Sequence, residues 1–365
     1  MKRRQFILAA SSLPFVHLVQ ADEFSEYLQA QSSGAKALQT GFEDYKSAYL
    51  KEYAAYKKKI EKEWDESKTT SPTQWVNYSG DMKSRTTIDY KKNTVQVSIR
   101  KSGDDSPETI KKLIHVAISK PASVAIKEDP VISTLHKDKS FSLGSVIMSG
   151  VNMAKAAVDK LIENARLLED QDSKGGFINV TVTLPESAKS DRVRQFLPMV
   201  AKYAKEFKIS PPLVLAIMHT ESAFNPLAQS HVPAFGLMQI VPKSAGLDVQ
   251  RLIYKRNQAP TSTMLFKPDV NIQHGCAYLH ILKYRYLKDI DDQASLEHCC
   301  IAAYNTGAGN VAKAFTGDTS VSKAVKIINK LTSGEVYMHL HKKLTHKEAR
   351  DYILRVNQHK AIYTV

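Results

Sequence analysis

Large apolar side chains recur every three or four residues between Phe42 and Trp64. This spacing places them on one face of an α-helix, so we predict a long helix over about residues 42–66. An aromatic stripe of this kind packs against a core or a partner more often than it forms a platform for a ligand. The members of the stripe are Phe42, Tyr45, Tyr49, Tyr53, Tyr56, Ile60 and Trp64.

Segments with strand-like patterns follow this helix. Alternation of apolar and polar residues with a period of two is typical of a half-buried strand, and it is clearest after Gly175-Gly176. Two other stretches, Glu108–Ser119 and Ser145–Leu168, have helical spacing instead. The predicted strands are Trp75–Tyr78, Ser84–Tyr90, Thr94–Ile99 and Phe177–Leu184.

Strand patterns almost vanish beyond the polar segment Pro185–Ser190. We therefore place a domain boundary near Ser190. The chain is predicted to contain an N-terminal α+β domain at residues 22–190 and a mainly α-helical domain at residues 191–365. Its overall fold class is α+β.

The second domain is predicted to consist almost entirely of helices. Ser210 and the two prolines after it open a helix that runs to about Thr220. Asp269 is expected to cap the next one, because a short acidic side chain precedes an apolar run there. The other predicted helices are Val270–Leu287, Ala294–Tyr304, Val321–Leu331, Glu335–Leu344 and Lys347–Lys360.

The first 21 residues have the pattern of a secretory signal peptide. Lys2-Arg3-Arg4 precedes an apolar run from Phe6 to Val19, and Val19-Gln20-Ala21 is a small-residue cleavage site. The Arg3-Arg4 pair also fits a twin-arginine export motif. No cysteine stands before Cys276, so none is present at the cleavage site to carry a lipid. We expect an exported, periplasmic protein with a cleavable signal peptide and no lipobox cysteine.

The charge of the chain is strongly positive, with 51 Lys and Arg residues against 37 Asp and Glu and a formal net charge of +14. Residues 1–21 contain three basic residues and no acidic one, so the chain stays basic without them. Such a surplus favours a polyanionic partner: nucleic acid, anionic lipid or a carboxylate-bearing polymer of the bacterial cell wall. A hydrophobic content of 43% is that of a folded globular protein and excludes a disordered chain.

The three cysteines, Cys276, Cys299 and Cys300, are too few and too unevenly spaced for a zinc site. We expect no metal and no cofactor. In an oxidising compartment Cys276 could form a disulfide with Cys299 or Cys300, or all three could be buried thiols, and the sequence leaves this choice open.

Glu221 is the candidate for acid catalysis. It stands at the C-terminal end of the helix that begins at Pro211, where the partial charge of the helix is negative. Ile217, Met218 and Phe224 are close in sequence and would withdraw it from water. Both effects raise the pKa of the carboxyl group, and a raised pKa suits an acid that protonates a glycosidic oxygen near neutral pH. Taken alone, the residue would be read as a surface glutamate ending a helix.

Five sequence blocks in a fixed order change that interpretation. Together they resemble the lysozyme-like catalytic domain of the soluble lytic transglycosylases, glycoside family 23, over about Asp191–Val365. Residues 40–190 are similar to the N-terminal domain of the membrane-bound lytic murein transglycosylases of type C. Pro233 departs from the pattern, because many relatives have glycine there. The blocks are Ala216–Pro226, followed by Ser230, then Phe235–Pro242, Asn271–Leu279, Ala302–Gly309 and Glu348–Ile353.

The resemblance implies a role for each site residue. Glu221 would be the single catalytic acid and then the base, with Ser222 beside it. Ser230 and Gln239 would hydrogen-bond the N-acetyl group and the sugar near the scissile bond, while Met238 would pack against the sugar ring.

The remaining implied residues shape the cleft. Gly236 would let the backbone approach the glycan without a Cβ atom in the way. Tyr304 and Asn305 would line the wall opposite the acid, and Tyr352 would reach toward it from the last helix.

A second catalytic carboxylate is not evident from the sequence. No acidic residue lies between Glu221 and Asp248, Asp248 lies beyond the Phe235–Pro242 block, and Asp269 is interpreted as a helix cap. Most glycosidases need two carboxylates, so substrate assistance by the N-acetyl group of N-acetylmuramic acid is favoured instead. The resemblance implies a 1,6-anhydromuramic product. The alternatives are a goose-type hydrolytic lysozyme, or a non-catalytic protein that binds murein or nucleic acid.

These considerations favour peptidoglycan glycan strands as the partner. Export argues against nucleic acid, and the basic charge leaves room for peripheral contact with an anionic membrane or with cell-wall proteins. Residues 22–190 contain no acid in a recognisable active-site block, so we expect them to position the enzyme on its polymer.

Overall fold

The computed structural model describes residues 47–135, 155–230 and 233–364, which belong to one compact unit. The predicted signal peptide and the first turn of the predicted long helix lie outside the described residues. So does the first part of the predicted helix Ser145–Leu168. Within the described ranges, no helix is long and apolar enough to cross a bilayer.

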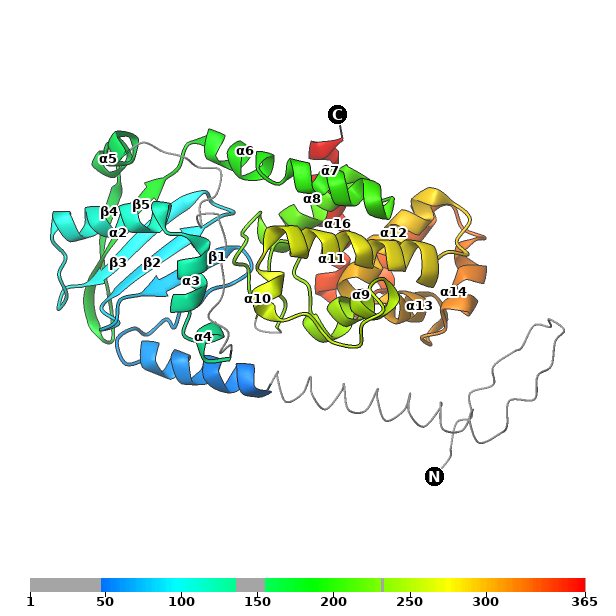
Figure 1. Cartoon of the computed structure of the whole chain (residues 1–365), viewed down its shortest axis with the longest axis horizontal. Helices are drawn as coiled ribbons and strands as arrows, with labels where there is room; N and C mark the ends of the chain where they lie inside the picture. The colour runs from blue at the N-terminus through cyan, green and yellow to red at the C-terminus, as the bar shows by residue number, and fades with distance from the viewer. Residues whose placement is uncertain (1–46, 136–154, 231–232, 365) are drawn as a thin grey trace, which may run out of the picture. The chain divides into compact units, whose positions relative to one another are not determined.

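A five-stranded antiparallel sheet dominates the first part of the chain (Figure 1). Its spatial order is β1-β2-β3-β5-β4, and all four strand predictions are confirmed. Helix α2 contacts β2 and β3, while α5 contacts β5. The strands are β1 (Gln74–Tyr78), β2 (Ser84–Asp89), β3 (Thr94–Arg100), β4 (Arg166–Asp172) and β5 (Gly175–Thr183).

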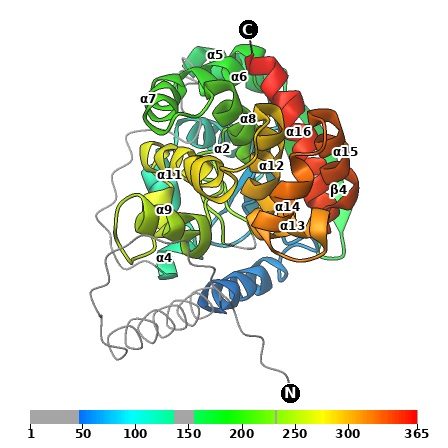
Figure 2. The same ribbon diagram turned by 90° about the vertical axis from the view of Figure 1, so that its right-hand side faces the viewer.

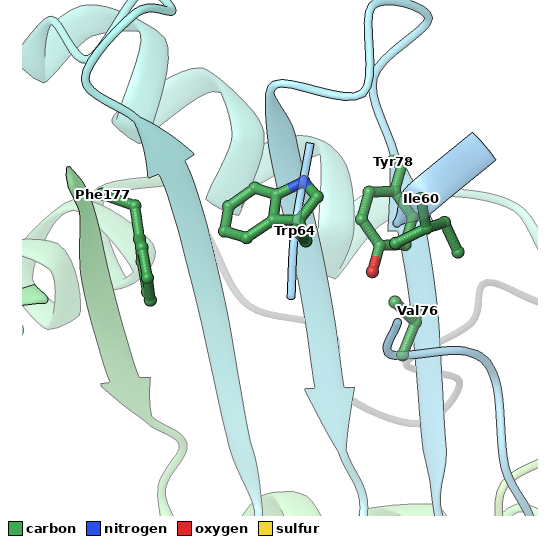
Figure 3. Packing of buried hydrophobic residues seen from close by; sticks show 5 residues of the cluster. All are labelled: Ile60, Trp64, Val76, Tyr78 and Phe177. Carbon is green, nitrogen blue, oxygen red and sulfur yellow. The ribbon is translucent and has the colours of Figure 1, made fainter. Parts of the chain in front are cut away.

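The aromatic stripe packs onto this sheet. Ile60 and Trp64 are fully buried against side chains of β1 and β5, as Figure 3 shows. The indole nitrogen of Trp64 donates a hydrogen bond to the Met82 carbonyl at 2.7 Å, and the guanidinium groups of Arg85 and Arg100 lie over its ring. The helix itself ends at residue 60, so the predicted end near residue 66 is wrong. The spacing predicts too long a helix because Trp64, which follows the turn after residue 60, is buried on the same side as the apolar face of the helix.

The edge strand β4 was not predicted. The segment was interpreted as the end of a helix because Leu167 and Leu168 are apolar, but α5 ends at Glu163 and both leucines are exposed. Antiparallel pairing with β5 through a tight turn before Gly175, whose φ is +117°, fixes this strand. Pairing of backbone groups thus overrides a weak side-chain pattern.

Helices joined by loops make up most of the described residues beyond β5, which confirms the predicted α+β class with a mainly helical second part. Helix α6 spans residue 190, so the segment interpreted as a boundary is helical, and the division at that residue stays a prediction. Lys267, not Asp269, is the N-cap of α11, because Pro268 occupies the first helical position. The helices of the first part are residues 47–60, α2 (Pro107–Ser119), α3 (Ala122–Glu128), α4 (Ile132–Leu135) and α5 (Lys155–Glu163).

In the second part, α8 packs alongside α16 and also contacts α7 (Figure 2). They agree with the predicted ranges at α8, α11, α12, α14, α15 and α16. The helices are α6 (Glu186–Arg194), α7 (Leu197–Phe207), α8 (Pro211–Ser222), α9 (Leu247–Leu252), α10 (Ser262–Leu265), α11 (Pro268–Ile281), α12 (Gln293–Thr306), α13 (Ala308–Thr316), α14 (Val321–Ile328), α15 (Ser333–Lys343) and α16 (Lys347–Tyr363), with single π-helical turns at Pro242–Gly246 and Leu282–Tyr286.

Candidate active site

Glu221 lies in the last turn of α8, a helix that is buried from Leu213 to Met218. Burial raises the pKa of its carboxyl group to about 7, and the nearby Glu348 acts in the same direction. Tyr352 and Arg355 act in the opposite direction and are outweighed. A carboxyl group with this pKa is partly protonated at neutral pH and can both give and take a proton.

The acid faces a cavity of about 540 Å³. Five of the predicted site residues line it: Glu221, Ser230, Gln239, Tyr304 and Asn305. The other four predicted residues, Ser222, Gly236, Met238 and Tyr352, are not among its lining residues. Pro72, Val241, Tyr278, Gly307, His346 and Glu348 contribute to the wall as well.

Ser222 is fully buried and faces the loop that carries Gln239. Its hydroxyl lies within hydrogen-bond distance of the carbonyl oxygens of Met218 (2.9 Å) and Leu237 (2.8 Å). The side chain therefore joins the end of α8 to this loop, and it does not border the cavity.

Gly236 and Met238 also lie behind the cavity wall. A Cβ atom at Gly236 would come within 2.4 Å of both Asn271 Nδ2 and the Leu265 carbonyl, so the close approach is to protein and not to open space. The fully buried Met238 side chain packs on Gly275, where a Cβ atom would lie 2.1 Å from its sulfur. The structure thus places both residues where they shape the loop from the inside.

Asn271 holds this loop and was not assigned a role from the sequence. Its side chain is fully buried; Nδ2 donates to the carbonyls of Phe235 (2.8 Å) and Leu265 (2.7 Å), and Oδ1 accepts from the Met238 amide (2.7 Å). A single amide side chain satisfies three buried backbone groups in this way. The only indication from the sequence was that Asn271 begins the block Asn271–Leu279.

Gln239 adopts a left-handed backbone conformation with φ of +47°. Its Nε2 atom donates to the carbonyls of Ala228 (3.1 Å) and Gly236 (3.0 Å). Both donors of the amide are thereby used, and the side-chain oxygen is the atom left to serve the cavity.

Two tyrosines stand near the acid. The Tyr304 hydroxyl donates to the Met238 carbonyl at 2.8 Å. The Tyr352 hydroxyl is buried and, among the described residues, has no hydrogen-bond partner at standard distance. It is close enough to Glu221 to matter electrostatically: burial first, and then the Glu221 carboxylate, raise the pKa of Tyr352.

The first part of the chain contributes to the site, which the sequence did not reveal. Pro72 lines the cavity, and its carbonyl accepts a hydrogen bond from Asn225 Nδ2 at 3.1 Å. Gln229 Nε2 donates to Asp129 Oδ2 at 2.9 Å, and the Tyr49 hydroxyl lies 3.3 Å from the Ser230 carbonyl. The loop that follows the acid is thus held from both parts of the chain.

Glu348 is a second carboxylate at the cavity. It is exposed at the start of α16, lines the same cavity as Glu221 and raises its pKa. Glu348 stands 127 residues after Glu221 in the sequence, and only the fold brings it back to the acid. Folding thus brings a second carboxylate to the cavity, while the expectation that Glu221 is the single catalytic acid stays a prediction.

The three cysteines are free and buried, so of the two alternatives left open, the thiols are present. Burial raises their pKa, to about 12 in the case of Cys300. Thiols of this kind are inert as nucleophiles.

Comparison with known proteins identifies the family. A family model described as the transglycosylase SLT domain matches residues 198–327. The chain is 32% identical over 331 residues to the membrane-bound lytic murein transglycosylase C of Photorhabdus laumondii, covering 86% of this chain and 91% of that protein. The chain belongs to the membrane-bound lytic murein transglycosylase C family. It is therefore a lytic murein transglycosylase, a lyase that acts on peptidoglycan.

Other members of this family are similar over much of the chain. The Shigella sonnei protein is 32% identical over 294 residues, covering 78% of this chain and 80% of that protein. The Pectobacterium atrosepticum protein is 43% identical over 179 residues, 49% of either chain. Among solved structures, the 70 kDa soluble lytic transglycosylase of Escherichia coli is similar with 24% identity and a TM-score of 0.35, over 48% of this chain and 25% of that one.

Proposed function

We propose that the enzyme cleaves the β-1,4 bond between N-acetylmuramic acid and N-acetylglucosamine without water, leaving 1,6-anhydromuramic ends. The observation that carries the proposal is the Glu221 carboxyl, which faces a cavity and has a pKa of about 7. Such a group is protonated often enough to act as an acid and ionised often enough to act as a base near neutral pH.

The reaction takes two steps. In the first, Glu221 protonates the glycosidic oxygen while the N-acetyl carbonyl oxygen of the muramic residue bonds to its own anomeric carbon, and the carbon–oxygen bond to the leaving sugar breaks. In the second, the Glu221 carboxylate takes the proton of the muramic 6-hydroxyl, whose oxygen bonds to the anomeric carbon and opens the oxazolinium ring. Glu221 ends protonated, as it began.

The polar side chains at the cavity orient the substrate in this proposal. Gln239, through its side-chain oxygen, and Ser230 bind the N-acetyl group and the sugar beside the scissile bond. Tyr304 and Asn305 form the wall opposite the acid. Ser222, Gly236 and Met238 act indirectly, because they fix the loop that carries Gln239. Tyr352 acts on the pKa of the acid.

We further propose that residues 22–190 and 191–365 are two domains and that the first helps to build the substrate cleft. Pro72 at the cavity and the hydrogen bonds to Asn225 and Gln229 support this role. The proposal replaces the simpler expectation that the first domain only places the enzyme on its polymer.

Export to the periplasm by way of the predicted signal peptide completes the proposal, because peptidoglycan lies outside the cytoplasmic membrane. The basic charge favours peripheral contact with anionic lipid or with cell-wall proteins. Salt would weaken that contact, since the attraction is screened beyond about 8 Å at physiological ionic strength.

Hydrolysis of the same bond is the second candidate function, and Glu348 favours it. A second carboxylate at the cavity could activate a water molecule, as in glycosidases that use two acids. The two reactions differ in their products, because hydrolysis creates reducing muramic ends and the transglycosylase reaction does not.

Substitution of the acid tests the shared part of both reactions. Glu221→Gln should lower murein-lytic turnover by about 10²- to 10⁴-fold, the usual contribution of general acid catalysis. Glu206→Gln, a matched change at an exposed glutamate of α7, should leave turnover unchanged. A folded Glu221→Gln variant with turnover near that of the wild type would disprove the proposal.

A further inference from the structure

A second cavity, of about 660 Å³, lies on the other side of α8. His219 lines this second cavity and Glu221 lines the first, although only two residues separate them. Each residue of an α-helix turns by about 100°, so their side chains leave α8 in nearly opposite directions. The cavity is built by the turn after β2, by α6, by the end of α8 and by the C-terminal turn of α16.

Basic side chains predominate around this second cavity. Lys91, Lys189, Arg192 and Arg194 line it, against a single acidic residue, Glu186. Glu186 binds Lys189, and Arg194 binds Asp191, which lies outside the lining. Lys91 is exposed and forms no ion pair with any residue that the structure describes. Burial and then His359 lower the pKa of His219, and the charges of Lys189 and Lys91 act in the same direction.

Arg192 is the feature that points to a ligand. Its side chain is buried, with 3% of its surface exposed, and its guanidinium group donates to Asn93 Oδ1 at 2.8 Å and to the Tyr90 carbonyl at 3.3 Å. Both acceptors are neutral, and no carboxylate within the described ranges forms an ion pair with it. Burial lowers the pKa of Arg192, and the charge of Glu186, which forms no ion pair with it, offsets this effect only in part. An anion in the cavity would offset more of the cost of burying the cation.

Aromatic side chains line the same cavity beside the charges. Phe224 packs on Phe196 in a stacked geometry and contacts Tyr363 edge-on. The Tyr363 hydroxyl lies 3.0 Å from His219 Nδ1, and the His219 ring stacks on His359 at 3.7 Å. Cavities of several hundred Å³ with apolar walls and a few charged groups suit small organic ligands and short peptides.

We propose that this second cavity binds the carboxylate-bearing peptide of murein and so gives the enzyme a hold on its polymer apart from the catalytic cleft. The inference rests on murein as the polymer on which the enzyme acts, and not on the anhydro product. A peptide fits better than a membrane surface, because the buried Arg192 can be reached by a single chain entering a hollow and not by a plane of headgroups.

Titration calorimetry with the full chain and a free murein stem tetrapeptide tests the proposal. The peptide should bind, and the same peptide with its carboxyl groups amidated should bind at least about tenfold more weakly, since charge-assisted hydrogen bonds are lost. Lys91→Glu combined with Lys189→Glu should weaken binding by a similar factor. Lys326→Glu combined with Lys330→Glu, an equal charge change at exposed lysines near the end of α14, should not.

Two further measurements separate this idea from the others. The Lys91 and Lys189 double variant should cleave peptide-free glycan as well as the wild type does, whereas Glu221→Gln should not cleave it. The peptide-binding proposal and the proposed reaction can therefore be tested separately. Absence of tetrapeptide binding, or binding that the double variant does not weaken, would overturn the proposal. A protein that binds phosphatidylglycerol vesicles through the two lysines, and does not bind the peptide, would also overturn it. That result would assign the cavity to lipid.

Discussion

Gln229 and Asp129 are joined by a 2.9 Å hydrogen bond between parts of the chain that lie 100 residues apart. Asp129 Oδ1 also accepts hydrogen bonds from the amides of Val131 (2.9 Å) and Ile132 (2.8 Å), at the start of α4. The carboxylate thus holds a helix on one side and, through Gln229, the loop of Ser230 on the other. Through this pair the first part of the chain can act on the active site.

Removal of this bond should affect both stability and activity. We expect Gln229→Ala to lower the free energy of unfolding by about 1–3 kcal/mol, because a buried carboxylate loses a donor. The turnover of murein should fall as well, because Ser230 directly follows the altered position. Gln358→Ala, at an exposed glutamine of α16, serves as the control in chemical denaturation and in turnover assays. Full activity of a destabilised Gln229→Ala protein would limit the bond to a structural role.

The packing behind the loop that carries Gln239 can be tested at Gly275, with Gly309 as the control, because both glycines lie in helices. Gly275→Ala should destabilise the fold, because the new Cβ atom would meet the buried Met238 side chain. Gly309→Ala should be neutral or stabilising by up to about 1 kcal/mol, since its Cβ atom finds only ordinary contacts at 3.5 Å and alanine favours a helix. Melting temperatures of the two variants test the packing, and equal values would contradict it.

The pH dependence of kcat/KM should report the acid. The Glu221 carboxyl must be protonated in the first step, so activity should fall as the pH rises through about 7. Glu348→Gln removes a negative neighbour that raises this pKa, so the basic limb of the profile should move to lower pH. A loss of turnover of about 10²-fold or more in this variant, without a shift of the limb, would instead make Glu348 a catalytic base.

Tyr352→Phe should move the same limb in the opposite direction. The tyrosine lowers the pKa of Glu221, so its removal should raise that pKa and extend activity to higher pH. Parallel pH profiles of this variant and of Glu348→Gln serve as controls for each other, and a shift in the same direction would contradict the assignment.

The stability of the enzyme should carry the signature of the same group. The folded state binds the Glu221 proton more tightly than the unfolded state, because the pKa is raised from 4.5 to about 7 on folding. Ionisation therefore opposes folding, and the free energy of unfolding should decrease as pH rises from about 4.5 to about 7, by about 1.4 kcal/mol for each pKa unit. Glu221→Gln should remove this part of the slope in denaturation curves recorded across that range.

Much of this fold could be predicted from local sequence patterns. The alternation at Phe177–Leu184 and the spacing in α8 depend on which side chains are buried, and both were predicted from the sequence. Strand β4 was not, because its leucines are exposed and only pairing with β5 makes it a strand. Trp64 is the opposite case. It is buried although it lies beyond the end of the helix, so its burial does not indicate helical structure.

The candidate site was predictable where one short block holds the chemistry and not where folding brings distant residues together. Glu221 and Gln239 were found in their blocks and line the cavity. Glu348 stands in a block that the resemblance brings near the acid, but its own place at the cavity was not predicted, and nothing in the local sequence of Pro72 predicts that it lines the cavity. Met238 was expected to touch the sugar, but apolar character alone does not tell a wall from the core behind it.

Analysis of the new glycan ends tests the central claim most directly. Purified peptidoglycan digested with the wild-type enzyme should yield muropeptides that end in 1,6-anhydromuramic acid, each lighter by one water than its hydrolysed counterpart in mass spectrometry. Borohydride should find few new reducing ends, and Glu221→Gln should release neither product. Digests dominated by reducible muramic acid ends would contradict the account and assign the cavity, with Glu221 and Glu348, to a hydrolase.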